Sequence, residues 1–362
     1  MFSSCPALGS CGFQVTPLTE PTTGIKRASI RDVARSAGVS ISTVSRALRG
    51  YSDVSSETRR RVQAAALELG YTPDAAGRAL KSGRSDTVAV FVSGSHGPAL
   101  SDTFYVEVLG GLEAQLAASD LSLLLVRASV KVQRVLQGGR CDGVIALGCD
   151  LPLPLLQTLH RAGTPLVLTD APSWPGGAPN VTVANEAGGY AATQHLLSGG
   201  RRRVAFIAET PDDPNFSLRR RGYLRAHEDA GQGAPAERQQ AGRLGTDGGY
   251  QATRKLLRAA PFDAIFAAND TAAFGALKAL AEAGRRVPDD VAVVGFDDIA
   301  LSRYSQPPLS TLRVPRRALG AEAADRLITL LAGGTAEPLE LPVSLIVRES
   351  SQHAPSAIRS SI

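Results

Sequence analysis

Apolar side chains recur at helical spacing in three short runs within residues 29–70. The first run ends at Gly38, and the second, over residues 41–48, follows Ser40, a residue suited to cap a helix. The third run ends at Gly70, which suits the left-handed backbone position after a helix. Two helices joined by a tight glycine turn, with a third helix closing the core, predict a helix-turn-helix fold.

From Thr87 onward the pattern changes to short apolar runs that alternate with amphipathic stretches. This alternation predicts parallel sheets built from βα units. The predicted strands cover residues 87–92, 121–126, 143–147, 165–169, 204–208, 264–267 and 291–295. The predicted helices cover residues 105–118, 153–161, 186–197, 218–230, 248–258, 271–283 and 316–331. Residues 311–314 and 341–348 are expected to be late strands where the chain crosses between two halves of the body.

Charge is distributed unevenly along the 362 residues. A hydrophobic content of 43% and a charged content of 20% are typical of a globular protein. Residues 25–86 hold 12 Lys or Arg against 6 Asp or Glu, whereas residues 87–362 hold 27 of each. A small basic module on a neutral body indicates a surface that binds a polyanion, most often a nucleic acid.

Several classes of protein are excluded by missing signals. The 4 cysteines lack close-spaced pairs with nearby histidines, so we expect free thiols, no disulfide framework and no metal site. Neither an export signal nor a run of ~20 apolar residues is evident, so we expect a cytoplasmic protein with no membrane partner. No HExxH, GxSxG or P-loop motif appears, so we expect neither enzyme activity nor a cofactor.

The helix-turn-helix segment carries a specific resemblance. Its sequence from Ser29 to Leu48, SIRDVARSAGVSISTVSRAL, is followed by VSSETR at residues 54–59 and LGYTP at residues 69–73. These runs resemble the DNA-binding headpiece of the LacI/GalR family of bacterial transcription regulators. Matching runs in the body are FY at 104–105, CDGV at 141–144, RRRGY at 219–223, AND at 268–270 and VGFDD at 294–298.

The resemblance implies an α/β protein with an N-terminal three-helix headpiece and a hinge, joined to a two-subdomain body similar to periplasmic binding proteins. The expected parts are a disordered tail (1–28), the headpiece (29–72), the hinge helix and linker (73–86), an effector-binding and dimerisation domain (87–354) and a C-terminal tail (355–362). Within that domain we expect an N-subdomain at about 87–183 and 312–340, and a C-subdomain at about 184–311 and 341–354.

The second helix of the headpiece is expected to enter the major groove of DNA. The candidate DNA-binding residues of the headpiece are Ser29, Ser40, Ile41, Ser42, Thr43, Ser45 and Arg46. Arg46 is the expected base reader, because a guanidinium can bond O6 and N7 of one guanine together. Arg31, Arg35, Arg49 and Arg59 are expected to face phosphates or solvent.

The hinge is expected to order only on DNA, because an isolated helix of about eight residues is marginal in water. The resemblance implies that Leu80 of each subunit wedges into the central base step of the minor groove, with Asp74, Gly77 and Arg78 beside the DNA. Simple packing of Leu80 between linker and body is the alternative. Gly77 and Asp74 stand where the family usually has Ala and Asn, so we expect weaker DNA binding than those residues would give.

The resemblance also implies a ligand held between the two subdomains. By position, Arg219, Asn269 and Asp297 are the expected hydroxyl-binding residues, with Asp170 and either Phe104 or Tyr105 from the other subdomain. A forked arginine and acceptor-only aspartates suit paired sugar hydroxyls, and an aromatic face suits the C–H surface of a sugar.

Other readings of the ligand region stay open at this point. Asn269 or Asp270 can simply cap the following helix, and Asp298 can simply fix its loop. Leu244 stands where family members often carry a ring-stacking aromatic residue, which leaves the identity of the effector open.

We therefore expect a homodimeric, sequence-specific DNA-binding transcriptional regulator, and more specifically a repressor. A small molecule, expected to be a sugar, would modulate its binding to a pseudo-palindromic operator on double-stranded DNA. The alternatives are an activator or an effector-independent regulator of the same family, a free-standing solute-binding protein, and a sugar-modifying enzyme.

Overall fold

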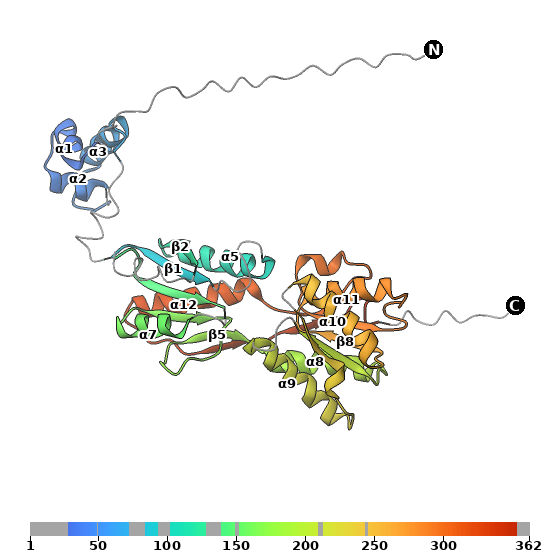
Figure 1. Cartoon of the computed structure of the whole chain (residues 1–362). Helices are drawn as coiled ribbons and strands as arrows, with labels where there is room; N and C mark the ends of the chain where they lie inside the picture. Colours follow the sequence, from blue (N-terminus) through green and yellow to red (C-terminus); the bar gives the residue numbers. More distant parts are fainter. Residues whose placement is uncertain are drawn as a thin grey trace, which may run out of the picture. The chain divides into compact units, whose positions relative to one another are not determined.

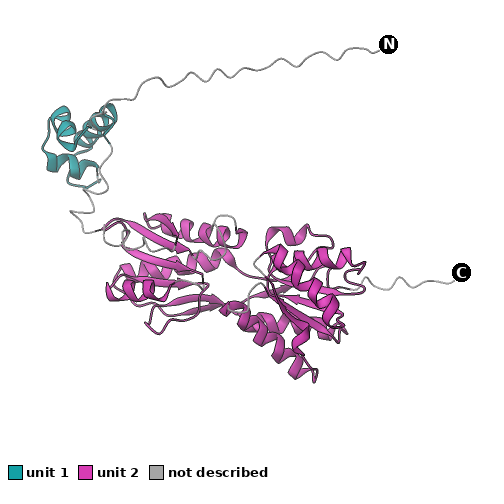
Figure 2. Ribbon diagram, viewed as in Figure 1, with its two compact units in different colours: residues 1–78 teal, residues 79–362 magenta. Residues whose placement is uncertain are grey.

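The computed structural model describes residues 28–48, 50–71, 84–92, 102–127, 139–148, 152–208, 213–242 and 245–352. The chain divides into two compact units, residues 1–78 and residues 79–362 (Figure 2).

Unit 1 contains three helices, α1 (Ile30–Ala37), α2 (Ile41–Leu48) and α3 (Ser56–Glu68) (Figure 1). One apolar residue from each helix, Val33, Val44 and Val62, is fully buried at 0% exposure. Gly38 and Gly70 have φ angles of 64° and 59°, which only glycine adopts readily. The predicted three-helix arrangement with its glycine turns is confirmed.

Unit 2 contains two six-stranded sheets in its described part. The first consists of β1 (Thr87–Val92), β2 (Ser122–Arg127), β3 (Gly143–Leu147), β4 (Leu166–Thr169), β5 (Asn180–Val183) and β11 (Leu339–Leu341), in the order β11-β5-β4-β3-β1-β2. The second consists of β6 (Val204–Ala208), β7 (Gln239–Ala241), β8 (Ala264–Ala267), β9 (Ala292–Asp297), β10 (Ser310–Arg313) and β12 (Ser344–Ile346), in the order β12-β10-β9-β8-β6-β7. Neighbouring strands are parallel except β10 and β12.

Helices cover both sheets (Figure 1). Around the first sheet lie α5 (Thr103–Ala117), α7 (Leu153–Arg161) and α12 (Arg316–Leu331). Around the second lie α8 (Asn185–Ser198), α9 (Pro214–Asp229), α10 (Thr246–Ala259) and α11 (Asp270–Glu282), with the short turns η2 (Ala236–Arg238) and η3 (Ala300–Arg303). The alternation of strands and helices in the sequence therefore predicted the fold class correctly.

The chain passes between the two sheets three times, from β5 to α8, from β10 to α12 and from β11 to β12. The second crossing follows Arg313, because Leu312 and Arg313 still pair with β9 of the second sheet. Residues 341–348 do not form the single strand expected of them. They contribute the end of β11 to one sheet and all of β12 to the other, and the third crossing lies between these two strands.

Two strands were missed by the sequence pattern, β5 and β7. Both are short, and β7 consists of the half-buried residues Gln239, Gln240 and Ala241 at the edge of its sheet. An edge strand with polar side chains lacks the apolar run by which the other strands were recognised.

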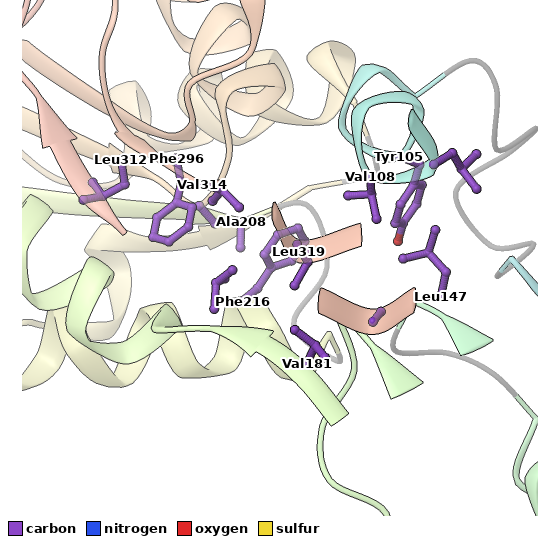
Figure 3. Packing of buried hydrophobic residues seen from close by; sticks show 14 of the residues in the cluster. Tyr105, Val108, Leu147, Val181, Ala208, Phe216, Phe296, Leu312, Val314 and Leu319 are labelled. Carbon is purple, nitrogen blue, oxygen red and sulfur yellow. The ribbon is translucent and has the colours of Figure 1, made fainter. Parts of the chain in front are cut away.

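One apolar cluster extends through both halves of unit 2 (Figure 3). It includes Tyr105 and Val108 beside the first sheet and Phe296 and Leu312 from the second, with Leu319 of α12 in the middle of the view. Since Val183 and Val314, at the first two crossings, are 1% and 2% exposed and belong to this cluster, these crossings are packed into a common core and are not free linkers.

Glycines allow α8 and α9 to lie in close contact. A Cβ atom at Gly189 of α8 would overlap the carbonyl oxygen of Arg219, and one at Gly222 of α9 would overlap that of Glu186. The pair α10 and α11 repeats this crossing, with Gly249 in the position of Gly189. The matching sequences GGYAAT at 188–193 and GGYQAT at 248–253 are an internal repeat that the sequence analysis did not identify.

Gly189→Ala tests this close crossing. Alanine in a helix is ordinarily more favourable than glycine by about 0.5–1 kcal/mol, but here its methyl group must push α8 away from α9. We expect a loss of about 2 kcal/mol in the free energy of unfolding, measured by urea denaturation.

Gly110→Ala in α5 is the matched control, because its Cβ would meet only the flexible end of Arg317 at 3.7 Å. We expect that variant to be as stable as the wild type or slightly more stable. Equal stability of the Gly189→Ala variant and the wild type would contradict the crossing.

Candidate functional site

Helix α2 presents a mixed outer face. Its apolar residue Ile41 is 45% exposed, and Ser42 and Arg46 are also exposed. Ser45 is half-buried, whereas Val44 on the opposite side is fully buried. The helix therefore packs by one face and leaves a row of short polar side chains, one isoleucine and one arginine available to a partner.

Hydroxyl groups fix the start of α2. The Ser40 Oγ accepts a hydrogen bond from the backbone N–H of Thr43 at 3.1 Å, and it lies 2.7 Å from the Ser42 Oγ. At the start of α1, the backbone N–H of Ser29 donates to the Asp32 carboxylate at 2.9 Å. The predicted start of α2 is therefore formed by the residue expected to cap it, and Ser29 and Asp32 form a capping box at the start of α1.

Arg46 is held in place on the outer face of α2. It forms an ion pair with Asp53, and its guanidinium carbon lies 5.4 Å from the ring centroid of Tyr51. Its side chain is nevertheless 49% exposed. These contacts orient the guanidinium before any partner arrives.

Arg59 differs from its expected role. Its Nη2 donates to the backbone carbonyl oxygens of Gly50 and Tyr51, at 3.3 and 2.8 Å. Arg59 therefore stabilises the loop after α2, a role that the expectation of phosphate or solvent contact did not include.

The four hinge residues predicted to contact DNA, Asp74, Gly77, Arg78 and Leu80, lie outside the described residues, as does Arg49. Their roles stay predictions.

The segment that leads into β1 is fastened to the first sheet by Asp142. One carboxylate oxygen accepts from the backbone N–H of Ser85 at 2.7 Å and from its hydroxyl at 2.8 Å, and the other accepts from the N–H of Asp86 at 2.9 Å. Because Asp142 directly precedes β3, the position of this segment is tied to that of the first sheet.

A cavity of about 410 Å³ lies between the two halves of unit 2. All six residues predicted to bind an effector line it: Phe104, Tyr105, Asp170, Arg219, Asn269 and Asp297. They come from α5, the end of β4, α9, the start of α11 and the end of β9. The structure thus brings together residues that are spread over nearly 200 positions of the sequence, at the carboxyl ends of parallel strands.

Arg219 is only 3% exposed and is fixed on several sides. Its Nε donates to the Asn185 side chain at 2.8 Å, and its Nη1 donates to the carbonyl oxygen of Ala268 at 2.5 Å. Its guanidinium carbon lies 3.8 Å from the ring centroid of Phe296, and Nη1 lies 3.7 Å from Asp297 Oδ1. Among the described residues none accepts a hydrogen bond from Nη2, which leaves this group for a ligand.

A chain of amides connects Arg219 to Asp170. The Asn185 Nδ2 donates to Asn215 Oδ1 at 3.1 Å, and the Asn215 Nδ2 donates to Asp170 Oδ1 at 3.1 Å. Since Asp170 follows β4 of the first sheet and Asn215 begins α9, this chain joins the two halves of unit 2. Asn215 was not among the residues predicted from the sequence, although the helix start Asp213-Pro214 beside it is a recognisable signal.

Asp297 is strained, buried and incompletely paired. Its φ angle of 115° is rare for a residue other than glycine, its exposure is 8%, and its Oδ1 has no hydrogen-bond partner among the described residues. Burial raises the pKa of Asp297 well above its ordinary value, although the Arg219 guanidinium opposes this shift. A buried carboxyl oxygen without a donor is a strong acceptor for a ligand hydrogen.

Asp170 has a similar setting, with a φ angle of 53° and 7% exposure. Burial raises its pKa to about 7, an effect that Arg219 opposes and that Asp213 and Asp102 increase. The two ligand-side carboxyl groups of this cavity are therefore protonated far more readily than exposed aspartates.

Neighbouring acidic residues have structural roles. Asn269 Oδ1 accepts from the backbone N–H of Ala272 at 2.9 Å, so Asn269 caps α11 and also lines the cavity. Asp270 is fully buried and accepts from two hydroxyls and one backbone N–H. Asp298 pairs with two arginines, one of them Arg348 at 2.6 Å. Of the two candidate caps, Asn269 therefore caps α11, whereas Asp270 binds residues of η3 and β10 and the residue before η3. The ion pairs of Asp298 fit its expected structural role.

Three phenylalanines line the cavity, Phe104, Phe216 and Phe274. Phe104 is half-buried, whereas Tyr105 is only 6% exposed and packs in the apolar core. Leu244, which stands where family members often carry a stacking aromatic residue, lies outside the described residues. Phe216 and Phe274 therefore add aromatic surface beyond Phe104, which was predicted from the sequence.

No group of three or more His, Cys, Asp or Glu side chains is placed to hold a metal ion in the part of the chain that the structure describes. Over the same residues, none of the helices is both long and apolar enough to span a bilayer.

Two family models match the chain. Residues 29–74 match the model of bacterial regulatory proteins of the lacI family, and residues 193–351 match that of a periplasmic binding protein-like domain. The HTH-type transcriptional regulator CelR of Thermobifida fusca is 37% identical over 338 residues, which are 90% of this chain and 98% of CelR. The ribose operon repressor of Escherichia coli K12 is 34% identical over 331 residues, 89% of this chain and 98% of that repressor.

Solved structures agree with these relatives. A Lac repressor dimer bound to operator and the anti-inducer ONPF has a TM-score of 0.80 at 28% identity, covering 91% of this chain and 100% of that one. A complex of the transcriptional regulator CelR with cellobiose has a TM-score of 0.68 at 36% identity, covering 90% of this chain and 100% of that one.

The raised pKa of Asp170 predicts a pH-dependent stability difference. The unfolded chain releases this proton near its ordinary pKa of 3.8, whereas the folded protein keeps it until about pH 7. The folded state thus binds more protons in this window, and the carboxyl group lowers stability as the pH rises through it. We expect Asp170→Asn to be more stable than the wild type at pH 8, by roughly a few kcal/mol, with the difference shrinking towards pH 4.

Thermal unfolding of both proteins across this pH range measures the difference. Asparagine tolerates the positive φ angle and can still accept from Asn215. Asp289→Asn, at an exposed carboxylate paired with Arg286, is the control. A stability difference between Asp170→Asn and the wild type that does not change with pH would contradict the assignment.

Proposed function

Because this chain belongs to the LacI family of bacterial regulatory proteins, which are DNA-binding transcription regulators, we propose that it is a repressor controlled by a sugar bound in the cavity of unit 2. The observation that carries the effector site is the meeting of six dispersed residues at one cavity. The rival reading as a free-standing solute-binding protein does not explain the headpiece match over residues 29–74.

The outer face of α2 reads operator bases in this proposal. Ser42 and Arg46 are exposed there, and Ile41 offers an apolar contact of the kind a thymine methyl group accepts. The capped helix starts, with Ser29, Ser40 and Thr43, and the neighbouring Ser45 lie where hydroxyls and amides can hold phosphates. Arg46 exchanges Asp53 for a guanine edge when it binds.

The protein acts as a homodimer on a pseudo-palindromic operator. Two headpieces read the two half-sites, and two Leu80 side chains enter the central minor groove with Asp74, Gly77 and Arg78 beside the DNA backbone. Support for the dimer comes from the Lac repressor dimer on operator DNA, to which this chain is similar over 91% of its length. Since the DNA of a bacterium lies in its cytoplasm, we place the protein there.

A sugar fits the chemistry of the cavity. Arg219 Nη2 donates hydrogen bonds, Asp297 and Asp170 accept them, and Asn269 can offer its amide N–H groups, while Phe104 supplies an apolar surface. The relatives point the same way, because one is named a ribose operon repressor and another is seen with cellobiose.

Closure of the two halves around the ligand is the proposed link to DNA. The three crossing segments are the places where the halves can turn against each other, and the amide chain from Arg219 to Asp170 joins them at the cavity. Asp142 fastens the segment at Ser85 to the first sheet, so a change in that sheet reaches the linker. A ligand that favours one orientation thereby shifts the population competent for operator binding. Whether control is repression or activation depends on where the operator lies relative to the promoter.

Arg46→Ala tests the readout by α2. We expect a loss of roughly 10- to 100-fold in affinity for a preferred operator, because one bidentate base contact is removed, and little change for random DNA. The operator is first selected from a library of randomised pseudo-palindromes, and affinities are measured by fluorescence anisotropy with the full chain.

Arg60→Ala is the control, since Arg60 is an exposed arginine of α3. It should leave the ratio of specific to random affinity unchanged. If Arg46→Ala leaves that ratio intact as well, Arg46 does not read bases.

A further inference from the structure

The charged groups around the cavity are unequal in sign. Its described lining contains four aspartates, Asp102, Asp170, Asp213 and Asp297, and Arg219 as the single cation. Negative charge therefore exceeds positive charge wherever these carboxyl groups are ionised.

The helix ends at the cavity do not correct this imbalance. The starts of α5 and α9 would ordinarily attract an anion through their unpaired backbone N–H groups. Asp102 already accepts from Phe104 N at 2.8 Å, and Asp213 accepts from Asn215 N at 2.7 Å and from Phe216 N at 3.2 Å. At these two helix starts the protein's own carboxylates thus occupy the places that a phosphate would take. The start of α10 (Gly245, Thr246), which also lines the cavity, has no side-chain cap but carries Asp247 in its first turn.

Arg219 is not a free counter-charge either. Two of its nitrogens donate to neutral oxygens of the protein, and Asp297 lies 3.7 Å from Nη1. Phosphate binding by arginine uses the two-pronged edge of an unengaged guanidinium, whereas only Nη2 is left here. An anionic ligand group would meet one partly used cation and several carboxyl groups.

One carboxyl oxygen in the described lining lacks a hydrogen-bond donor. Asp297 is 8% exposed, and its Oδ1 accepts no hydrogen bond from the described residues, with the Arg219 Nη1 at 3.7 Å. Asp170 on the facing half is 7% exposed, and among the described side chains only that of Asn215 donates to it. Leaving such oxygens unpaired is costly, and a hydroxyl or ammonium group of a ligand relieves that cost.

We propose that the effector is a neutral or cationic polyhydroxylated molecule, such as an uncharged sugar or an amino sugar, which donates hydrogen bonds to Asp297 and Asp170, and that sugar phosphates and sugar acids are rejected. This inference rests on the proposed function of the cavity as a sugar site. It adds a rule on the charge of the ligand, which the names of the relatives do not state.

Calorimetry of the full-length protein with matched ligands tests the rule. The panel pairs ribose with ribose 5-phosphate, glucose with glucosamine, gluconate and glucose 6-phosphate, and cellobiose with cellobionate. For each neutral sugar of the panel that binds, we expect its phosphate or acid derivative to bind at least about 100-fold more weakly. We expect glucosamine to bind no more weakly than glucose. An anionic member that binds as tightly as its neutral counterpart, or that alone binds, overturns the rule while the sugar site stands. If none of these sugars or derivatives binds, both the sugar site and the rule on ligand charge are contradicted.

Asp102→Asn supplies a second readout that a folding defect cannot imitate. Asparagine still caps α5, so the variant removes one negative charge at nearly constant shape. We expect the ratio of anionic to neutral affinity to rise about tenfold. Asp289→Asn, outside the cavity lining, should leave this ratio unchanged. An unchanged ratio in the Asp102→Asn variant would overturn the electrostatic argument.

Discussion

The burial of the Arg219 guanidinium is the constraint on which much of unit 2 depends. A charged group at 3% exposure is tolerable only if hydrogen bonds, a counter-charge and a well-packed surface replace its water. Asn185, the Ala268 carbonyl, Asp297 and the ring of Phe296 supply these replacements. They come from the start of α8, the residue after β8, and β9, so the packing of the second sheet and its helices is fixed around one side chain. The glycine crossing of α8 and α9 brings the helix that carries Arg219 close enough to reach them.

The cavity between the two halves of unit 2 is the part of this arrangement that a ligand can change. Asp297 and Asp170 end strands of opposite sheets, and both have positive φ angles and raised pKa values. Backbone strain and incompletely paired carboxyl groups are concentrated at the surface that a ligand would contact. A ligand that donates hydrogen bonds there favours the orientation of the two sheets in which both carboxyl groups reach it. The common apolar core extends through both halves, and Asp142 fastens the segment at Ser85 to the first sheet.

Local signals in the sequence were sufficient for much of the fold. Caps, glycines at helix ends and apolar runs located α1 to α3 and the central strands, because these features depend on neighbouring residues. The polar edge strand β7 was missed, since its pairing is set by the sheet and not by its own composition. The six cavity residues were identified through the family resemblance, but Asn215 was not, because its role exists only when α9 meets the end of β4. The close contact at Gly189 likewise depends on the crossing of α8 and α9, which the residues next to Gly189 in the sequence do not indicate.

The central claim is that a ligand in this cavity controls operator binding. Operator affinity of the full-length protein, measured by fluorescence anisotropy with and without a saturating sugar ligand, tests it in the wild type and in Arg219→Lys. Lysine keeps the charge beside Asp297 but lacks the fork of donors. We expect a shift in operator affinity of at least about fivefold in the wild type and a much smaller shift in the variant, each measured against the same protein without sugar. A shift of the same size in both proteins would contradict control of operator binding through this cavity.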